Sequence, residues 1–351
     1  MGTPGTKVSA EHRREMGNRF AVRAAIMAPS IHNTQPWQFA SREDGICLYA
    51  DFSRHLPRTD PAGRELVISC GAASMNLQLA MRHLGFAADV RLLPDIRRPD
   101  MLVEATWGHY RRKDRYEDSL FHAMSRRHTH YGPFVLRPMP PMLMAELAAA
   151  AHAESASLMV VAEAAKRRLL AELIRGAEMA ESADPEAASE LARWVAPPRS
   201  GRVDGVPART GQVEPVAFAD RGFLLGNGRM PMANPGPHVM ASGFGTAVLL
   251  TTRGDRRLDW ILAGRALQRV LLHAAIYDVS AAFHTQALEL PGPRSKIQAE
   301  IAAGAHPQVL LRLGYASSTR ATPRRPVTDV LAMGGQPDRM PRQGLVTQGA
   351  A

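Results

Sequence analysis

The chain has 351 residues, of which 45% are hydrophobic, enough for two modest domains or one large one. Its formal net charge is +10, but the arginines are scattered and no basic tract is interleaved with aromatic residues, which argues against a nucleic-acid-binding protein. No apolar stretch is long enough for a membrane helix and the amino terminus has no apolar signal core, so we expect a cytoplasmic protein that does not engage a membrane.

The first set of predicted elements lies within residues 11–107. A helix is predicted at 11–28, because apolar residues from Met16 to Met27 recur at helical spacing, and Pro29 ends it. The elements that follow are strands at 38–39 and 46–49, a long helix from the Asp60-Pro61 cap to about residue 84, and strands at 87–92 and 102–107.

A second set of elements begins near residue 117 and ends near residue 314. Residues 197–243 within it are rich in glycine and proline and show little periodicity, which predicts a lid, a binding loop or a disordered segment. The tail after Gly314 is rich in arginine and proline and is predicted to be an extended arm. The regular elements expected are helices leading into 126–130 and at 140–152, 162–180 and 258–277, with strands at 158–161, 246–252, 280–284 and 308–313.

The two longest predicted helices resemble each other in sequence. Gly71 lies within the run 70–73 and Gly264 within the run 263–266, and aliphatic residues follow both glycines at matching offsets. Glycine in mid-helix costs about 1 kcal/mol relative to alanine, so two at equivalent places indicate a close backbone contact. We therefore predict an internal duplication, although any two buried helices can share such spacing.

The cysteines and clustered histidines predict no metal site. Cys47 and Cys70 have no CxxC partner and are expected to be small buried side chains. His122, His128 and His130 lie close together in the sequence, but their spacing matches no zinc pattern.

The segment 29–37 is the clearest candidate for a functional loop. Two prolines stiffen it, and Ser30, Asn33 and Gln35 supply both hydrogen-bond donors and acceptors. The edge of a flavin ring needs such a mixed set. On spacing alone, a turn that caps the preceding helix, with Trp37 in the core, is the simpler interpretation.

Several motifs in order resemble the nitroreductase superfamily. Residues 28–39 are similar to its flavin-contacting loop, and residues 60–73 resemble the Acg-type branch of NAD(P)H nitroreductases. Three further motifs resemble the same branch: Trp194 followed by residues 205–209, the run 263–266 and the run 307–314. The resemblance extends over about residues 15–332, and the combination is more specific than any one motif.

The resemblance implies an α+β, nitroreductase-like fold in which two halves, 1–115 and 116–351, are fused in one chain and mimic the usual homodimer. It implies one FMN per chain, because residues 150–157 of the second half lack a ring loop. The lid is expected at about 197–243. The flavin-binding residues implied are Pro29, Ser30, His32, Asn33, Gln35, Pro36, Trp37, Gln38 and Phe39 at the ring, and Arg126, Arg127, Thr129, Arg324 and Arg325 at the phosphate and ribityl chain.

Two departures from the family pattern stand out. His130 and Tyr131 occupy positions where the family usually has an acid or amide and a further arginine, which removes one basic group from the phosphate segment. Asp278 and Val279 stand where the family usually has Gly-Leu or Gly-Met, close to the reactive edge of the flavin.

The leading functional hypothesis is an FMN-binding oxidoreductase of nitroreductase type that takes a hydride from NAD(P)H and passes it to a small acceptor. The cofactor carries the chemistry, so no catalytic side chain is named. The alternative is a protein that stores or sequesters FMN under the lid, with little or no turnover. A basic regulatory or nucleic-acid-binding module is the third class. A second chain is not required, but further homodimerisation stays open.

Overall fold

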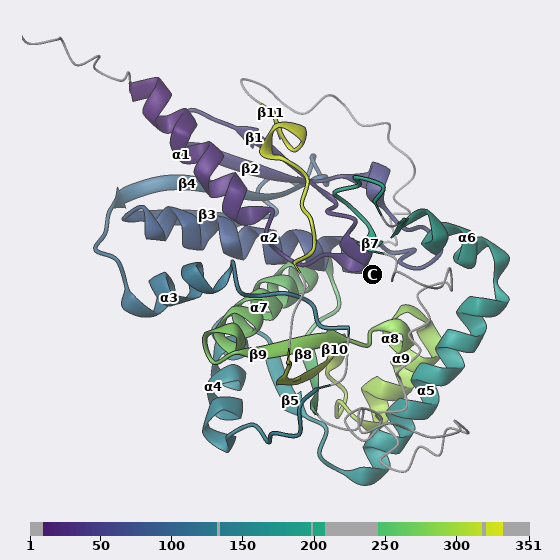
Figure 1. Cartoon of the computed structure of the whole chain (residues 1–351). Helices are drawn as coiled ribbons and strands as arrows, with labels where there is room; N and C mark the ends of the chain where they lie inside the picture. Colours follow the sequence, from purple (N-terminus) through teal and green to yellow (C-terminus); the bar gives the residue numbers. More distant parts are fainter. Residues whose placement is uncertain (1–9, 132–133, 198, 208–244, 318–320, 333–351) are drawn as a thin grey trace, which may run out of the picture.

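The computed structural model describes residues 10–131, 134–197, 199–207, 245–317 and 321–332 (Figure 1). Most of the predicted lid, from residue 208 onward, lies outside the described residues. Two sheets face each other across a layer of long helices (Figure 1). In the described part of the chain, no helix is both long and apolar enough to cross a bilayer.

The first sheet has the strand order β11-β1-β2-β4-β3. Neighbours among β1 to β4 are antiparallel, and β11 joins β1 in parallel, so the carboxyl-terminal arm completes a sheet built by the amino-terminal residues. One face packs on α1 and α2 through side chains such as Trp37 and Phe39. The bounds are α1 (Ala10–Ala25), β1 (Trp37–Ser41), β2 (Gly45–Ala50), α2 (Arg64–His83), β3 (Phe86–Leu92), β4 (Met101–Tyr110) and β11 (Leu331–Ala332).

The second sheet is antiparallel, with the order β5-β8-β10-β9. Side chains alternate along β8: Val248 and Leu250 face α4 and α7, while Ala247 and Leu249 face α5, α8 and α9. Both faces are therefore covered. The bounds are α4 (Pro141–His152), β5 (Ser157–Val160), α5 (Ala164–Ala183), β8 (Thr246–Thr252), α7 (Arg257–Ile276), β9 (Val279–Phe283), α8 (Gln286–Glu289), α9 (Pro291–Glu300) and β10 (His306–Tyr315).

The remaining elements connect the two sheets. Helix α3 (Arg115–Ala123) follows the first sheet and leads to Thr129, which forms a bridge with Ala281 of the second sheet. Helix α6 (Pro185–Arg193) precedes a small parallel pair, β6 (Val195–Ala196) and β7 (Val206–Pro207).

The two sheets share one connection pattern. In each, two strands are followed by a long helix and two more strands, and the last two enter the sheet in reversed order. The long helices α2 and α7 cross at Gly71 and Gly264. A Cβ added at Gly71 would collide with the Ile261 carbonyl oxygen, and one added at Gly264 with the Ile68 carbonyl oxygen. The predicted close contact between the two glycine-bearing helices is confirmed.

The long first-half helix begins later than its predicted cap. Helix α2 starts at Arg64, and its N-cap is Gly63 in the left-handed conformation with φ 69°. Asp60 accepts a hydrogen bond from the Gly63 N–H through its carbonyl, forming a turn, while its side chain accepts the Leu66 N–H at 2.9 Å. Asp60 therefore satisfies a backbone N–H in the first turn of α2, although Gly63 and not Asp60 is the N-cap. The helices α6, α8 and α9 were not predicted.

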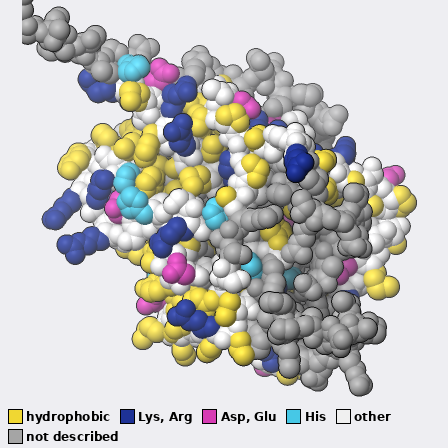
Figure 2. Space-filling view, viewed as in Figure 1, with side chains coloured by type: hydrophobic (Ala, Val, Ile, Leu, Met, Phe, Trp, Pro, Cys, Tyr) yellow, Lys and Arg dark blue, Asp and Glu magenta, His cyan; other side chains and the backbone are white. Residues whose placement is uncertain are grey.

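Cys47 and Cys70 are free and buried, as expected. Basic side chains are spread over the face seen in Figure 2 rather than gathered in one tract.

Candidate functional site

The loop between α1 and β1 has a constrained backbone. His32, Asn33 and Gln35 all have positive φ, at 43°, 55° and 51°, which non-glycine residues adopt only when their surroundings enforce it. The Ser30 hydroxyl accepts the Gln35 N–H at 2.9 Å and closes the loop on itself. The stiffness predicted from the two prolines thus has a second source in this hydrogen bond.

The side-chain amides of Asn33 and Gln35 hold the loop to two distant segments. Asn33 Nδ2 donates to the Gly205 carbonyl at 3.0 Å and to the Pro323 carbonyl at 3.3 Å. Gln35 Nε2 donates to the Val203 carbonyl at 2.8 Å. Both residues are buried. The loop, residues 203–205 and the carboxyl-terminal arm therefore meet at these two amides.

The arm contributes two arginines with different surroundings. Arg324 donates from Nη1 to Asn33 Oδ1 at 3.0 Å and from Nη2 to the Ala28 carbonyl at 3.1 Å. Arg325 donates its backbone N–H to Gln35 Oε1 at 2.8 Å and its guanidinium to the Asp329 carbonyl. Arg325 also lies 3.9 Å from the Asp51 carboxylate, so its charge is balanced within the protein.

Arg127 meets Arg324 at the end of α1. Its Nη2 donates to the Met27 carbonyl at 3.2 Å, and Arg324 Nη2 lies 3.5 Å from the same oxygen. Burial, and then the charge of Arg324, lower the pKa of Arg127 to about 9, and burial lowers that of Arg324 to about 10. Both stay cationic at neutral pH. Among the described residues, neither forms an ion pair with a carboxylate, and the buried Nε of each has no hydrogen-bond partner.

A buried cation beside a second, partly buried one is costly unless an anion compensates the two charges. The two unused Nε–H groups are donors of the kind that binds a phosphate in forked geometry. A phosphate-sized dianion is the ligand that this arrangement can best accommodate.

Arg126 and Thr129, the other two candidates between α3 and β9, have surroundings that differ from those of Arg127. Arg126 is half exposed, with Nη1 3.7 Å from the Asp278 carboxylate. The backbone around Thr129 pairs with β9, and the next N–H, that of His130, donates to the Ala281 carbonyl at 2.8 Å. Arg126 and Arg127 line a cavity of about 230 Å³ that includes Asp278, Ser280 and Phe283 in its wall. Asp278 itself has a positive φ of 57°, a conformation for which the family's glycine would be better suited.

The remaining sequence candidates fall into two groups. Trp37 and Phe39 are fully buried in the first core, and Pro29 and Pro36 are buried beside them, whereas Gln38 donates to Asp51 at 3.2 Å. The buried Nε2 of His32 has no hydrogen-bond partner in the part of the chain that the structure describes, and burial lowers the pKa of His32 to about 4, so it is neutral at physiological pH.

Arg54 is a site residue that the sequence did not indicate. Its Nη1 donates to the Thr34 carbonyl and to Asp204 Oδ2, each at 2.9 Å, and its guanidinium lies over the Trp194 ring at 5.8 Å. It therefore fixes the segment 194–207 to the loop. Arg54 and Asp204 are 150 positions apart, so no spacing pattern in the sequence links them. Trp194, by contrast, belongs to a motif that resembles the Acg-type branch.

Comparison with known proteins places the chain among nitroreductases. The Mycobacterium tuberculosis protein Rv3131, named as a candidate NAD(P)H nitroreductase, is 33% identical over 320 residues, covering 89% of this chain and 90% of its own. Acg of the same organism, named likewise, is 28% identical over 326 residues, covering 88% and 93%.

No family model matches the chain. Among solved structures, the FMN-dependent nitroreductase NfnB of Mycobacterium smegmatis aligns with 66% of this chain and 99% of its own at 18% identity and a TM-score of 0.33. Identity to Rv3131 over nearly the whole of both chains decides the assignment. The chain belongs to the NAD(P)H nitroreductase family, in the branch that includes Acg.

Proposed function

We propose that the protein is an FMN-dependent oxidoreductase that takes a hydride from NAD(P)H and delivers it to a small acceptor. The observation that carries the proposal is the pair Arg127, which is buried, and Arg324, which is partly buried. Each has a buried Nε without a hydrogen-bond partner, and neither has a carboxylate partner in the described residues. The names of Rv3131 and Acg support the same activity.

The residues present fit FMN. Its phosphate is a dianion, which the two arginines would hold, while the constrained loop around His32 and Asn33 would hold the ring. The buried, unpartnered Nε2 of His32 is a further polar atom available to a ligand. When bound, FMN supplies the redox chemistry by accepting and releasing a hydride. Of the two arm arginines, Arg324 is the better phosphate ligand, because Arg325 is committed to Gln35, Asp51 and Asp329.

In this proposal Asn33 and Gln35 are chiefly positioning residues. Their amides hold residues 203–205 and the arm against the ring loop, so they set where Arg324 lies. Trp37 and Phe39 would act from the core by supporting the loop.

We further propose that residues 1–115 and 116–351 are fused equivalents of two subunits and share one FMN per chain. The common strand order of the two sheets and the reciprocal contact of Gly71 with Gly264 support this. The proposed site is itself composite: the ring loop comes from the first half, and Arg127 and Arg324 from the second.

A second function, FMN storage, is favoured by the contacts of residues 203–205. Asn33, Gln35 and Arg54 together hold this segment on the ring loop, which would slow the exchange of a bound flavin and limit access to it.

Anaerobic addition of NADPH to the purified protein after incubation with FMN separates the two functions. An oxidoreductase loses its flavin absorbance near 450 nm rapidly on addition of NADPH, a generic property of reduced flavins. Bound FMN that neither NADPH nor NADH reduces would rule out the oxidoreductase and leave storage. A protein that binds no FMN would refute both.

A further inference from the structure

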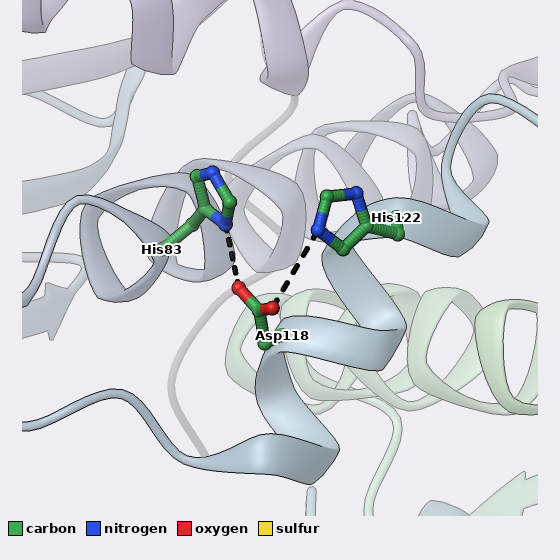
Figure 3. A group of neighbouring side chains, drawn as sticks. All are labelled: His83, Asp118 and His122. Carbon is green, nitrogen blue, oxygen red and sulfur yellow. Dashed lines mark hydrogen bonds and ion pairs between the residues drawn. The ribbon is translucent and has the colours of Figure 1, made fainter.

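A cluster of two histidines and one aspartate lies away from the proposed flavin site. His83 is in the last turn of α2, and Asp118 and His122 are one turn apart on α3 (Figure 3). His83 Nδ1 lies 2.6 Å from Asp118 Oδ1, and His122 Nε2 lies 3.5 Å from Asp118 Oδ2. The three ligand atoms all lie within 4.8 Å of one another.

Aromatic packing fixes the His83 ring. Its ring centroid lies 3.9 Å from that of Phe121, with an angle of 11° between the ring planes. The corresponding values for Phe20 are 6.1 Å and 15°. The His122 ring stands nearly perpendicular to His83, at 88°. Two imidazole nitrogens therefore point at one carboxylate from different directions, as Figure 3 shows. Side chains held in place before a metal arrives lose little freedom on binding it.

We propose that His83, Asp118 and His122 form a binding site for one divalent transition metal, with Zn²⁺ as the best-matched ion. Two imidazoles and a carboxylate are ligands that Zn²⁺, Co²⁺ and Ni²⁺ accept, whereas Ca²⁺ and Mg²⁺ require more oxygen ligands. Tetrahedral ligands about 2 Å from zinc lie roughly 3.3 Å apart, so the 2.6 Å contact opens by a small side-chain rotation.

The charges around the cluster permit such a site. Burial raises the pKa of Asp118, but the hydrogen bond from His83 and nearby positive charges outweigh it and leave the pKa below its usual value. The positive charges that contribute are those of His83, His122 and Lys113. Glu117 pairs with Arg82 at 2.9 Å, so it does not compete for the ion.

The site would attach α3 to α2. Helix α3 ends at Ala123, three residues before Arg126 and the phosphate segment. A metal bridging the two helices would therefore stabilise the connection that presents Arg127. No local spacing reveals this cluster, because His83 lies 35 residues from Asp118 in the sequence.

The test is a titration of the untagged, full-length protein with Co²⁺, followed by visible d–d absorption. We expect one saturable Co²⁺ per chain, displaced by Zn²⁺, and at least about tenfold weaker binding after His122→Ala or Asp118→Asn. His122 is 64% exposed, so its replacement leaves the core intact. His109→Ala, which removes an exposed histidine on β4, is the matched control and should bind as the wild type does.

Thermal denaturation gives an independent readout. Zn²⁺ should raise the unfolding midpoint of the wild type and of His109→Ala, but not that of His122→Ala or Asp118→Asn, because only a ligand of the folded state stabilises it. The proposal is overturned if Co²⁺ does not saturate, or if the two ligand variants bind it as tightly as the control.

Discussion

Arg324 donates a hydrogen bond to Asn33 Oδ1 across 3.0 Å, joining the carboxyl-terminal arm to the loop that begins the first sheet. The two residues are 291 positions apart. The bond fixes one guanidinium next to Arg127, and the resulting pair of cations defines where an anion can bind. The proposed cofactor site is therefore assembled only in the folded chain, from a loop, a helix-to-sheet connection and the arm.

Removing the two amides of the loop should release both segments that they hold. In Asn33→Ala/Gln35→Ala, the carbonyls of Val203, Gly205 and Pro323 lose their amide donors. The loss costs about 1–3 kcal/mol at the buried Gly205 carbonyl and less at the other two, which water can reach. We expect a lower free energy of unfolding in urea and no detectable FMN binding, because residues 150–157, where the second half would carry its own ring loop, lack the polar side chains and prolines of 29–37. FMN binding at wild-type affinity in this variant would show that the amides do not position the site.

The contact of α2 with α7 should tolerate no side chain at its two glycines. Gly71→Ala or Gly264→Ala would place a methyl group against a backbone carbonyl, so we expect a loss of about 1–3 kcal/mol, despite the better helix propensity of alanine. Gly176→Ala on α5 is the control: nothing lies within 4 Å, and a gain of up to about 1 kcal/mol is expected. If urea denaturation gave the same change in the free energy of unfolding for Gly71→Ala, Gly264→Ala and Gly176→Ala, the close packing of α2 on α7 would be contradicted.

The stability of the apoprotein should fall on acidification partly through His32. Burial lowers its folded-state pKa from 6.5 to about 4, so between these values the unfolded chain binds more protons and stability declines with falling pH. The limit is about 1.4 kcal/mol per pH unit. His32→Asn, which tolerates the positive φ, should show a shallower decline between pH 6.5 and 4.5 in urea denaturation. Parallel curves for the two proteins would show that His32 does not contribute.

Arg54 should control how fast the flavin exchanges. Arg54→Ala removes the hydrogen bonds to Thr34 and Asp204 and the contact with the Trp194 ring. We therefore expect FMN to dissociate several-fold faster, while the free energy of unfolding changes proportionally less. Arg58→Ala is the control, because Arg58 forms surface ion pairs with Asp184 and Glu186, which contribute little. Dissociation unchanged from the control would count against any role of residues 194–207 in retaining FMN.

Much of the fold could be predicted from periodicity. The long helices, the strand pairs and the close approach at Gly71 and Gly264 all leave local patterns. The short helices α8 and α9 did not, because α8 has four residues and α9 begins at Pro291, which reads as a breaker. The pairing of β11 with β1 was also invisible, since two residues at the end of an arm carry no strand pattern.

The candidate site divides in the same way. The loop 29–37 and the arginines were visible in the sequence as motifs. The roles of individual residues depended on contacts between distant segments. Arg325 lies 3.9 Å from the Asp51 carboxylate, whereas Arg324, its neighbour in the chain, has no carboxylate partner among the described residues. No local pattern distinguishes them, because the difference lies in what each meets after folding.

The most direct test of the proposed site compares FMN with riboflavin, which lacks only the phosphate. We predict that the wild type binds FMN far more tightly than riboflavin, measured by quenching of flavin fluorescence, and that Arg127→Gln/Arg324→Gln loses most of this preference while still folding. Arg19→Gln, an exposed arginine on α1, should keep it. A double variant that still prefers FMN as strongly as the wild type would contradict the assignment of the phosphate to Arg127 and Arg324.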